Sequence, residues 1–249
     1  MFHDHYVWFF WSIAFLITWL FVYVAAPRQR QAMIWGSLFT VPLGLTEPLF
    51  VPSYWDPPSL FDLAQKTGFD IESLIFSFAI GGIGAILYNI LTRREPAALP
   101  LASRAAPRHQ LHNWALAVPF FSFPLLYLFA WNPIYPAITA MALGAIAAMS
   151  CRLDLAPKIG LGSLLFLAYY TVFLLGLEVT APGYIERVWN LQALSGFKIA
   201  GLPIEELLFA AAFGAYWSSV YEHFTWRRLV SLNEGAKPSC GNSRQDIQG

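Results

Sequence analysis

Charged side chains are scarce in this chain: Asp, Glu, Lys and Arg make up 12% of its 249 residues, whereas soluble domains carry roughly 25%. Apolar residues make up 57%, and the mean hydropathy is +0.51. The formal net charge is zero, which indicates no nucleic-acid partner. This composition predicts an integral membrane protein, most of whose length crosses a lipid bilayer.

Cysteine is also rare, since the chain has only Cys151 and Cys240. Both fall in segments expected on the cytoplasmic side, so we predict no disulfide, and no metal-binding cysteine spacing occurs. His109, His112 and His223 are too scattered along the sequence to predict a metal site. Glycine-rich phosphate loops, a dinucleotide fingerprint and a Ser-His-Asp pattern are lacking. We therefore expect no cofactor and no metal.

Long apolar runs are what the sequence has in place of charge. A helix needs about 20 apolar residues to cross roughly 30 Å of hydrocarbon, and seven runs meet that length. The first is too long for a signal-peptide core and lacks a cleavage pattern, so it is expected to stay as an anchor. The turn between the fourth and fifth runs must be very tight. The predicted spans are residues 6–26, 32–50, 71–91, 112–131, 133–151, 159–179 and 202–224.

The positions of Lys and Arg predict the orientation of these spans, because cytoplasmic loops accumulate positive charge. With the N-terminus outside, the inner segments hold Arg28, Arg30, Arg93, Arg94, Arg104, Arg108, Arg152, Lys158, Arg227, Arg228, Lys237 and Arg244. The outer segments hold only Lys66, Arg187 and Lys198. This asymmetry predicts a multi-pass protein of the cell membrane with its N-terminus outside and its C-terminus inside.

An internal duplication is visible along the chain. The residues Gly, Ile, Glu, Leu, Phe, Gly and Tyr recur in register between 68–88 and 201–221, which is the signature of a repeat. We predict an all-α protein of two parallel three-helix repeats joined by a linking helix, an arrangement that places sites at the repeat interface. The expected units are repeat one (1–95), the linker and fourth helix (96–131), repeat two (132–226) and a disordered polar tail (227–249).

Five glutamates lie near the expected outer ends of the repeated spans: Glu47, Glu72, Glu178, Glu205 and Glu206. An ionised group at membrane depth is costly, so such groups usually face the bundle interior and mark function. Burial and like-charge repulsion keep some crowded carboxyl groups protonated beside others that are ionised. A proton donor and a proton acceptor could then coexist without a cofactor. The alternative is that Glu72, Glu205 and Glu206 only stabilise helix N-termini.

Aromatic residues make up 17% of the chain, and some of them could line a pocket. Spacings of four and eleven place Phe209 and Tyr216 on the helix face of Glu205, and Phe76 on that of Glu72. Trp55 and Trp189 lie in the outer loops between repeated spans. These rings could stabilise a transient cation, although helix packing and interfacial anchoring predict the same pattern.

The motif Pro203-Ile204-Glu205-Glu206, followed by Leu207-Leu208-Phe209, resembles the Pro-x-Glu-Glu signature of membrane-integral lycopene cyclases. These are the archaeal, fungal and actinobacterial type, built from two copies of one cyclase domain. The first copy departs from the signature, since it reads Asp70-Ile71-Glu72-Ser73. Seven helices also resemble microbial rhodopsins, but no lysine falls in the last span, which excludes a retinal Schiff base there.

The resemblance implies a non-redox isomerase of the lycopene β-cyclase type, in which a carboxylic acid protonates a linear carotenoid, a ring closes, and a base removes a proton. Glu205 is the expected acid, with Glu206 and Glu72 as partner or base and Glu47 and Glu178 adjusting the cluster. Phe76, Phe209, Tyr216, Trp55, Trp189 and Pro203 are the expected substrate contacts. The expected partners are a polyene or isoprenoid, the bilayer, and either a second subunit or other carotenoid-pathway enzymes. A non-catalytic isoprenoid-binding protein and, less favoured, a proton-coupled transporter remain the alternatives.

Overall fold

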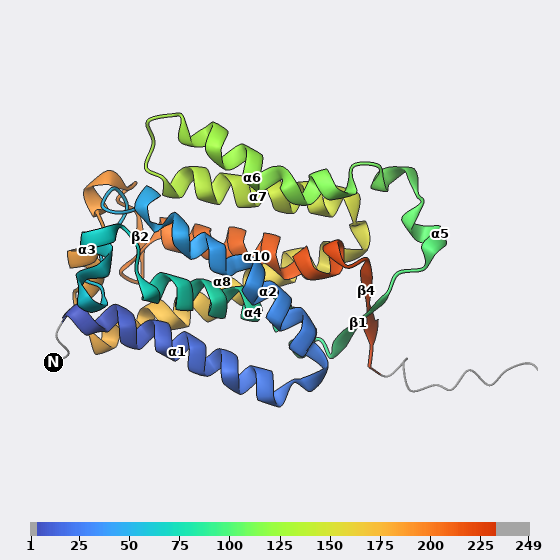
Figure 1. Ribbon diagram of the computed structural model, residues 1–249, viewed down its shortest axis with the longest axis horizontal. Helices are drawn as coiled ribbons and strands as arrows, with labels where there is room; N and C mark the ends of the chain where they lie inside the picture. The colour runs from blue at the N-terminus through green and yellow to red at the C-terminus, as the bar shows by residue number, and fades with distance from the viewer. Residues whose placement is uncertain (1–3, 233–249) are drawn as a thin grey trace, which may run out of the picture.

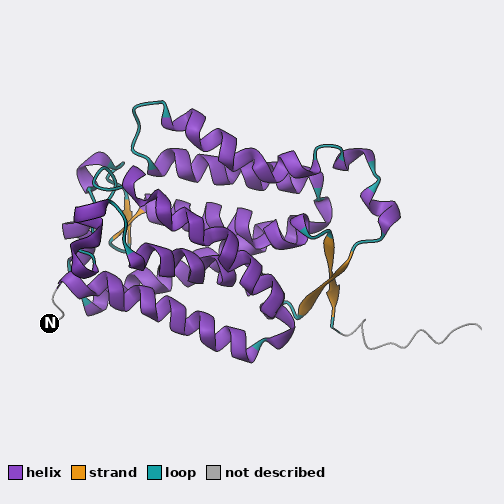
Figure 2. Cartoon of the chain, in the orientation of Figure 1, coloured by secondary structure: helices purple, strands orange, loops and turns teal. Residues whose placement is uncertain are grey.

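The computed structural model describes residues 4–232 and is predominantly helical, which confirms the all-α prediction (Figures 1 and 2). Most long helices run along the long axis of the molecule, with loops and short strands at its two ends. The helices, with 3-10 segments written η, are α1 (Asp4–Ala25), η1 (Pro27–Gln29), α2 (Arg30–Thr40), η2 (Val41–Leu49), η3 (Leu60–Asp62), α3 (Leu63–Thr67), α4 (Ile71–Leu91), α5 (Leu101–Arg104), η4 (Pro107–His109), α6 (His112–Tyr127), α7 (Ile134–Cys151), η5 (Leu153–Leu155), α8 (Ala156–Thr180), α9 (Tyr184–Val188), η6 (Leu191–Ala193) and α10 (Ile204–Phe224).

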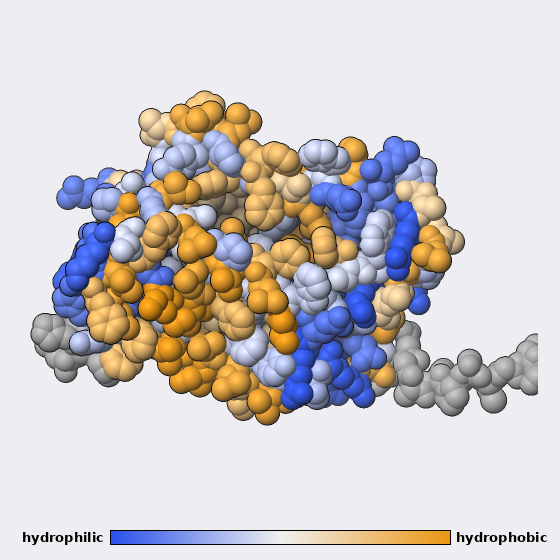
Figure 3. All heavy atoms as spheres, viewed as in Figure 1, coloured by the Kyte–Doolittle hydropathy of each residue, from blue (hydrophilic) through white to orange (hydrophobic). Residues whose placement is uncertain are grey.

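Four segments of the described chain are long and apolar enough to cross a membrane: His5–Ala25, Ile71–Leu91, Ile134–Cys151 and Leu153–Thr180. They coincide with four of the seven predicted spans. Figure 3 shows hydrophobic residues over the middle of one face and hydrophilic residues toward both of its ends. Large apolar side chains such as Phe21 and Val172 are more than 70% exposed, as expected where lipid replaces water. The chain is a membrane protein.

The span predicted over residues 32–50 is helical to Leu49, but only its first half is α-helix. The α-helix ends at Thr40, and Val41–Leu49 continues as 3-10 helix. Pro42 and Pro48 explain the change, because proline lacks the backbone N–H and clashes with the carbonyl four residues earlier. Glu47 is therefore carried by a 3-10 segment.

Two further predicted spans differ from the observed helices. The span expected at 112–131 is a shorter helix of 16 residues, α6, with Pro119 and Pro124 inside it. The tight turn expected before residue 133 is instead the loop 128–133. The last span begins two residues late, because residues 202–203 form a strand and α10 starts at Ile204.

Helices α4 and α10 lie at the centre of the bundle. Each has 21 residues, they pack against one another, and α2 and α8 pack on them. Glycine allows the closest of these approaches: a Cβ atom on Gly81 of α4 would lie 1.9 Å from Thr40 Oγ1 of α2. On the other side, a Cβ atom on Gly214 of α10 would lie 2.8 Å from the Gly162 carbonyl oxygen of α8.

Four short strands make two small antiparallel sheets: β1 (Arg94–Ala98) with β4 (Arg227–Ser231), and β2 (Lys198–Ile199) with β3 (Leu202–Pro203). Pro96 lies opposite Leu229 in the first sheet. Figure 1 places β2 at the opposite end of the molecule from β1 and β4. Trp55 and Trp189 form an isolated antiparallel bridge. The disordered tail expected from 227 thus begins as a paired strand, and residues 233–249 lie outside the described part.

Candidate functional site

A cavity of about 470 Å³ lies among α2, η2, α4, α6, α7, α8 and α10. Its walls are mostly apolar, and two of the five predicted glutamates, Glu47 and Glu206, reach it. The volume falls within the range of small-molecule sites, which is about 300–1,000 Å³. An apolar cavity with a few convergent polar groups is the usual form of such a site.

Glu206 lies at the cavity as an acceptor of three hydrogen bonds. Tyr170 Oη donates to Oε2 at 2.8 Å, Trp189 Nε1 donates to Oε1 at 2.6 Å, and the Tyr54 hydroxyl also donates to Oε1. Burial, and then the charge of Glu206, raises the pKa of Tyr54 well above its ordinary value, so this hydroxyl keeps its proton. These three hydrogen bonds fix the position of the Glu206 carboxyl group at the cavity wall.

Glu47 has a different environment. Its Oε2 lies 3.1 Å from Ser73 Oγ, which lies 3.2 Å from Asp70 Oδ2, while Glu47 Oε1 is buried without a partner. Ser73 has one hydroxyl proton, and Asp70 accepts the Ser73 backbone N–H at the start of α4. The single Ser73 hydroxyl proton can therefore be donated to Glu47 or to Asp70, but not to both at once.

The other predicted acids lie away from the cavity lining. Glu205 is buried and accepts hydrogen bonds from Tyr135 Oη at 2.9 Å and Ser195 N at 2.8 Å. Glu72 accepts the Leu60 backbone N–H at 2.7 Å, and Glu178 accepts the backbone N–H groups of the turn into α9. These three carboxyl groups each accept a backbone N–H from the loops that join the helices at this end of the molecule. The prediction that Glu205 is the acid stays a prediction.

The predicted aromatic contacts reach the cavity, whereas Pro203 does not. Phe76, Phe209, Tyr216, Trp55 and Trp189 all line it, and Pro203 is buried in β3. The Trp55 and Trp189 rings lie 5.3 Å apart between centroids. Sequence reasoning missed Tyr54, Tyr170 and Ser73, because a tyrosine or serine in an apolar chain carries no distinctive spacing.

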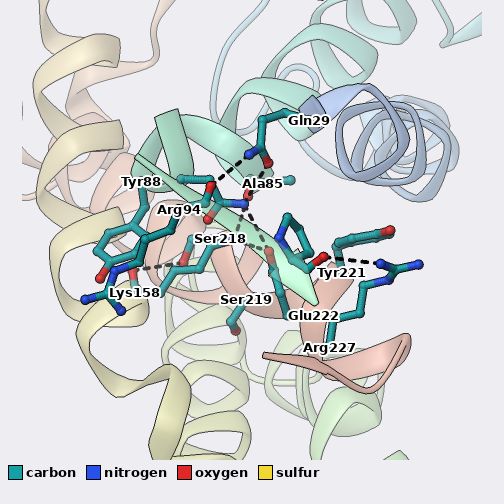
Figure 4. Close-up of polar contacts among 12 residues, drawn as sticks. Gln29, Ala85, Tyr88, Arg94, Lys158, Ser218, Ser219, Tyr221, Glu222 and Arg227 are labelled. Atoms are coloured by element: carbon teal, nitrogen blue, oxygen red, sulfur yellow. Dashed lines mark hydrogen bonds and ion pairs between the residues drawn. The ribbon is translucent and has the colours of Figure 1, made fainter. Parts of the chain in front are cut away.

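A second buried polar cluster lies at the opposite end of α10 (Figure 4). Lys158 Nζ lies 2.7 Å from Glu222 Oε1 and 2.8 Å from the Ala85 carbonyl oxygen. Asn89 donates to the same Glu222 oxygen at 3.1 Å and to Gln29 at 3.0 Å. Lys158 and Glu222 are at most 1% exposed. Lys158 is therefore the cation of an internal ion pair, whereas the sequence predicts it among the charges of the cytoplasmic segments.

The structure brings together three side chains that the sequence leaves apart. His109, His112 and Cys151 offer ligand atoms within 4.8 Å of one another. Two of the three histidines thus lie together with Cys151, while the expectation of no metal site stays a prediction. The two histidines are distant from Cys151 in the sequence, but the start of α6 packs beside the end of α7.

Comparison with known proteins gives one family. Residues 132–224 match the family model described as lycopene cyclase. The matched segment begins just before α7 and ends with α10, so it includes Glu205 and Glu206 but not Glu47. No curated protein and no solved structure matches the chain.

Proposed function

We propose that this chain closes the end groups of a linear, lycopene-like carotenoid into rings, because residues 132–224 match the lycopene cyclase family model. The observation that carries the proposal is the apolar cavity reached by both Glu47 and Glu206. We assign proton donation to Glu47, because a protonated Glu47 can donate to Ser73 while Ser73 donates to Asp70. We assign proton acceptance to Glu206, which already accepts three hydrogen bonds. An acid–base pair of this kind supports an isomerisation without a redox cofactor.

Glu47 begins the reaction by transferring its proton to the terminal double bond of the polyene. The resulting carbocation is attacked by a neighbouring double bond, which forms the carbon–carbon bond of the ring and moves the positive charge into it. Glu206 then removes a proton from a carbon next to that charge, as in a cyclase of the β type. The product is an isomer of the substrate, and the cycle ends when the proton returns from Glu206 to Glu47.

The aromatic lining supports the cationic step. Tyr170, Phe209 and Phe213 follow one another along the cavity wall, with centroid separations of 5.9 Å between successive rings. The negative face of an aromatic ring attracts a nearby cation by about 0.5–2 kcal/mol. A dry, ring-lined wall also keeps water from capturing the carbocation before the ring closes.

The same proposal includes seven spans and two repeats, with the N-terminus outside. Helices α4 and α10 begin at Ile71 and Ile204, which are equivalent positions of the sequence repeat. Pro96 and Leu229, which pair in the first sheet, are separated by the same number of residues as Ile71 and Ile204. Trp55 and Trp189, which form the isolated bridge, are separated by one residue more. A pseudo-twofold axis along the membrane normal relates repeats of this kind. The polyene reaches the cavity from the bilayer, in which it is soluble.

Expression of the chain in a lycopene-accumulating host, followed by chromatography of the pigments, tests the proposal. New cyclised carotenoids are expected. Unchanged lycopene in cells whose membranes contain the protein would contradict this function, and a polyene that co-purifies unchanged would identify a binding protein instead.

A further inference from the structure

A buried cluster of metal-ligand atoms lies at the end of the molecule away from Trp55 and Trp189. His109 is in η4, His112 is the first residue of α6, and Cys151 is the last residue of α7. The three side chains are 4–7% exposed. Cys151 Sγ lies 3.3 Å from His109 Nδ1 and 3.4 Å from His112 Nδ1.

The hydrogen bonding of His112 orients its ring for ligation. Its Nε2 atom lies 2.9 Å from the His223 carbonyl oxygen. A carbonyl can only accept, so Nε2 carries the hydrogen and the lone pair lies on Nδ1, facing Sγ. A ring that donates one N–H to a backbone carbonyl while offering the other nitrogen is the usual state of a metal-bound histidine.

Two arginines lie near the cluster, and each has a partner or faces solvent. Arg152 is fully buried, but it is paired with Asp154 at 2.7 Å and donates to the Arg227 carbonyl oxygen at 2.7 Å. Arg108 Nε lies 3.4 Å from His109 Nε2, but the Arg108 side chain is exposed and can turn into solvent when His109 binds a metal through Nδ1.

We propose that His109, His112 and Cys151 form a zinc site. Tetrahedral Zn²⁺ with ordinary bond lengths places sulfur and nitrogen ligands about 3.6 Å apart, close to both observed separations. Binding replaces the thiol proton of Cys151, which leaves to solvent, with a Zn–S bond. The fourth position is open to water or to His223, whose ring lies 4.1 Å from that of His112 and whose ring nitrogens are buried without partners.

Such a site joins three elements at one point. It links η4 and the start of α6 to the end of α7, and α10 contributes the carbonyl that orients His112. Helix α6 also carries Phe120 and Phe123 of the cavity wall. The zinc ion would therefore have a structural role and would hold α6 in its position beside the cavity.

The test is elemental analysis of the full chain, purified in detergent after equilibration with Zn²⁺ and removal of the excess. About one zinc ion per chain is expected. Cys151→Ser and His112→Ala should each lose most of it, whereas Cys151→His should keep it. The matched controls, Cys240→Ser and His5→Ala, should bind as the wild type does.

Cobalt provides a second measurement that needs no variant. Co²⁺ bound to the wild-type chain should show thiolate-to-metal charge transfer in the near ultraviolet, displaced by added Zn²⁺. Chelation should lower the temperature of thermal unfolding, and Zn²⁺ should restore it. A wild-type chain that binds neither metal, or a Cys151→Ser chain that binds both as tightly as the wild type, would overturn the proposal. The cluster would then be a metal-free hydrogen-bonded triad.

Discussion

The hydroxyl group of Tyr54 donates a hydrogen bond to the Glu206 carboxylate across 152 residues of sequence. Tyr54 follows η2 in the first half of the chain, and Glu206 belongs to the segment that matches the lycopene cyclase family. The contact ties the two halves together at the cavity. The hydrogen-bond donors to Glu206 thus come from both halves of the chain.

Replacing Tyr54 with Phe should slow cyclisation by about tenfold to a hundredfold, because one hydrogen bond to a charged group contributes about 1.5–3 kcal/mol. Tyr170 and Trp189 would still hold Glu206 in place. Pigment yield at matched protein levels measures the effect. Tyr127→Phe is the control, since Tyr127 is 40% exposed at the end of α6. Equal yields from the two variants would mean that Tyr54 does not support Glu206.

Replacing Glu47 with Gln should lower cyclisation by about a hundredfold or more, the usual contribution of a positioned general acid. The amide keeps the size of the side chain and can still contact Ser73, so the fold should be retained. Glu178→Gln is the comparison. The Glu178→Gln change weakens the hydrogen bonds to the turn before α9. It should therefore reduce thermal stability while leaving most of the cyclase activity. If Glu47→Gln kept its activity and Glu178→Gln lost it, Glu47 would not be the acid.

Lys158→Met should destabilise the protein by about 3–5 kcal/mol, because it leaves Glu222 as a buried charge without its cation. The double variant Lys158→Met with Glu222→Gln removes both charges and should recover much of the loss. Thermal unfolding in detergent compares the three proteins. A double variant no more stable than the single one would show that the pair does not act through its charge.

Gly81→Ala should destabilise the packing of α2 on α4 by about 1–3 kcal/mol, because the added methyl group has no space beside Thr40. Gly160→Ala is a matched control in α8, with no atom within 4 Å of the added carbon. The control should be neutral or slightly stabilising, as alanine favours helix over glycine. Similar unfolding temperatures for both variants would contradict the close approach.

The sequence predicts the long helices well and the proline-containing ones poorly. The span 71–91 coincides with α4, because an uninterrupted apolar run fixes both the type and the length of the helix. The change of helix type within residues 32–50 is not predicted, because hydrophobic periodicity does not show how Pro42 and Pro48 alter the backbone hydrogen bonds. The short strand β4 is missed because its partner, β1, lies in the other half of the chain.

The site is predicted in its residue types more than in its geometry. Glu205 and Glu206 point about 100° apart on a helix, but their spacing does not say which of them faces the cavity. Packing decides that: Tyr135 and Ser195 hold Glu205, while Tyr170 and Trp189 hold Glu206. Residues that meet only in three dimensions, such as His112 and Cys151, carry no sequence signal.

The most direct measurement is pigment analysis of a lycopene-accumulating host that expresses the wild type, Glu206→Gln or Glu205→Gln at equal membrane levels. We expect cyclised carotenoids from the wild type, almost none from Glu206→Gln, and a substantial yield from Glu205→Gln. Full activity of Glu206→Gln together with loss in Glu205→Gln would contradict the assignment, and the acceptor would then have to be sought outside the cavity.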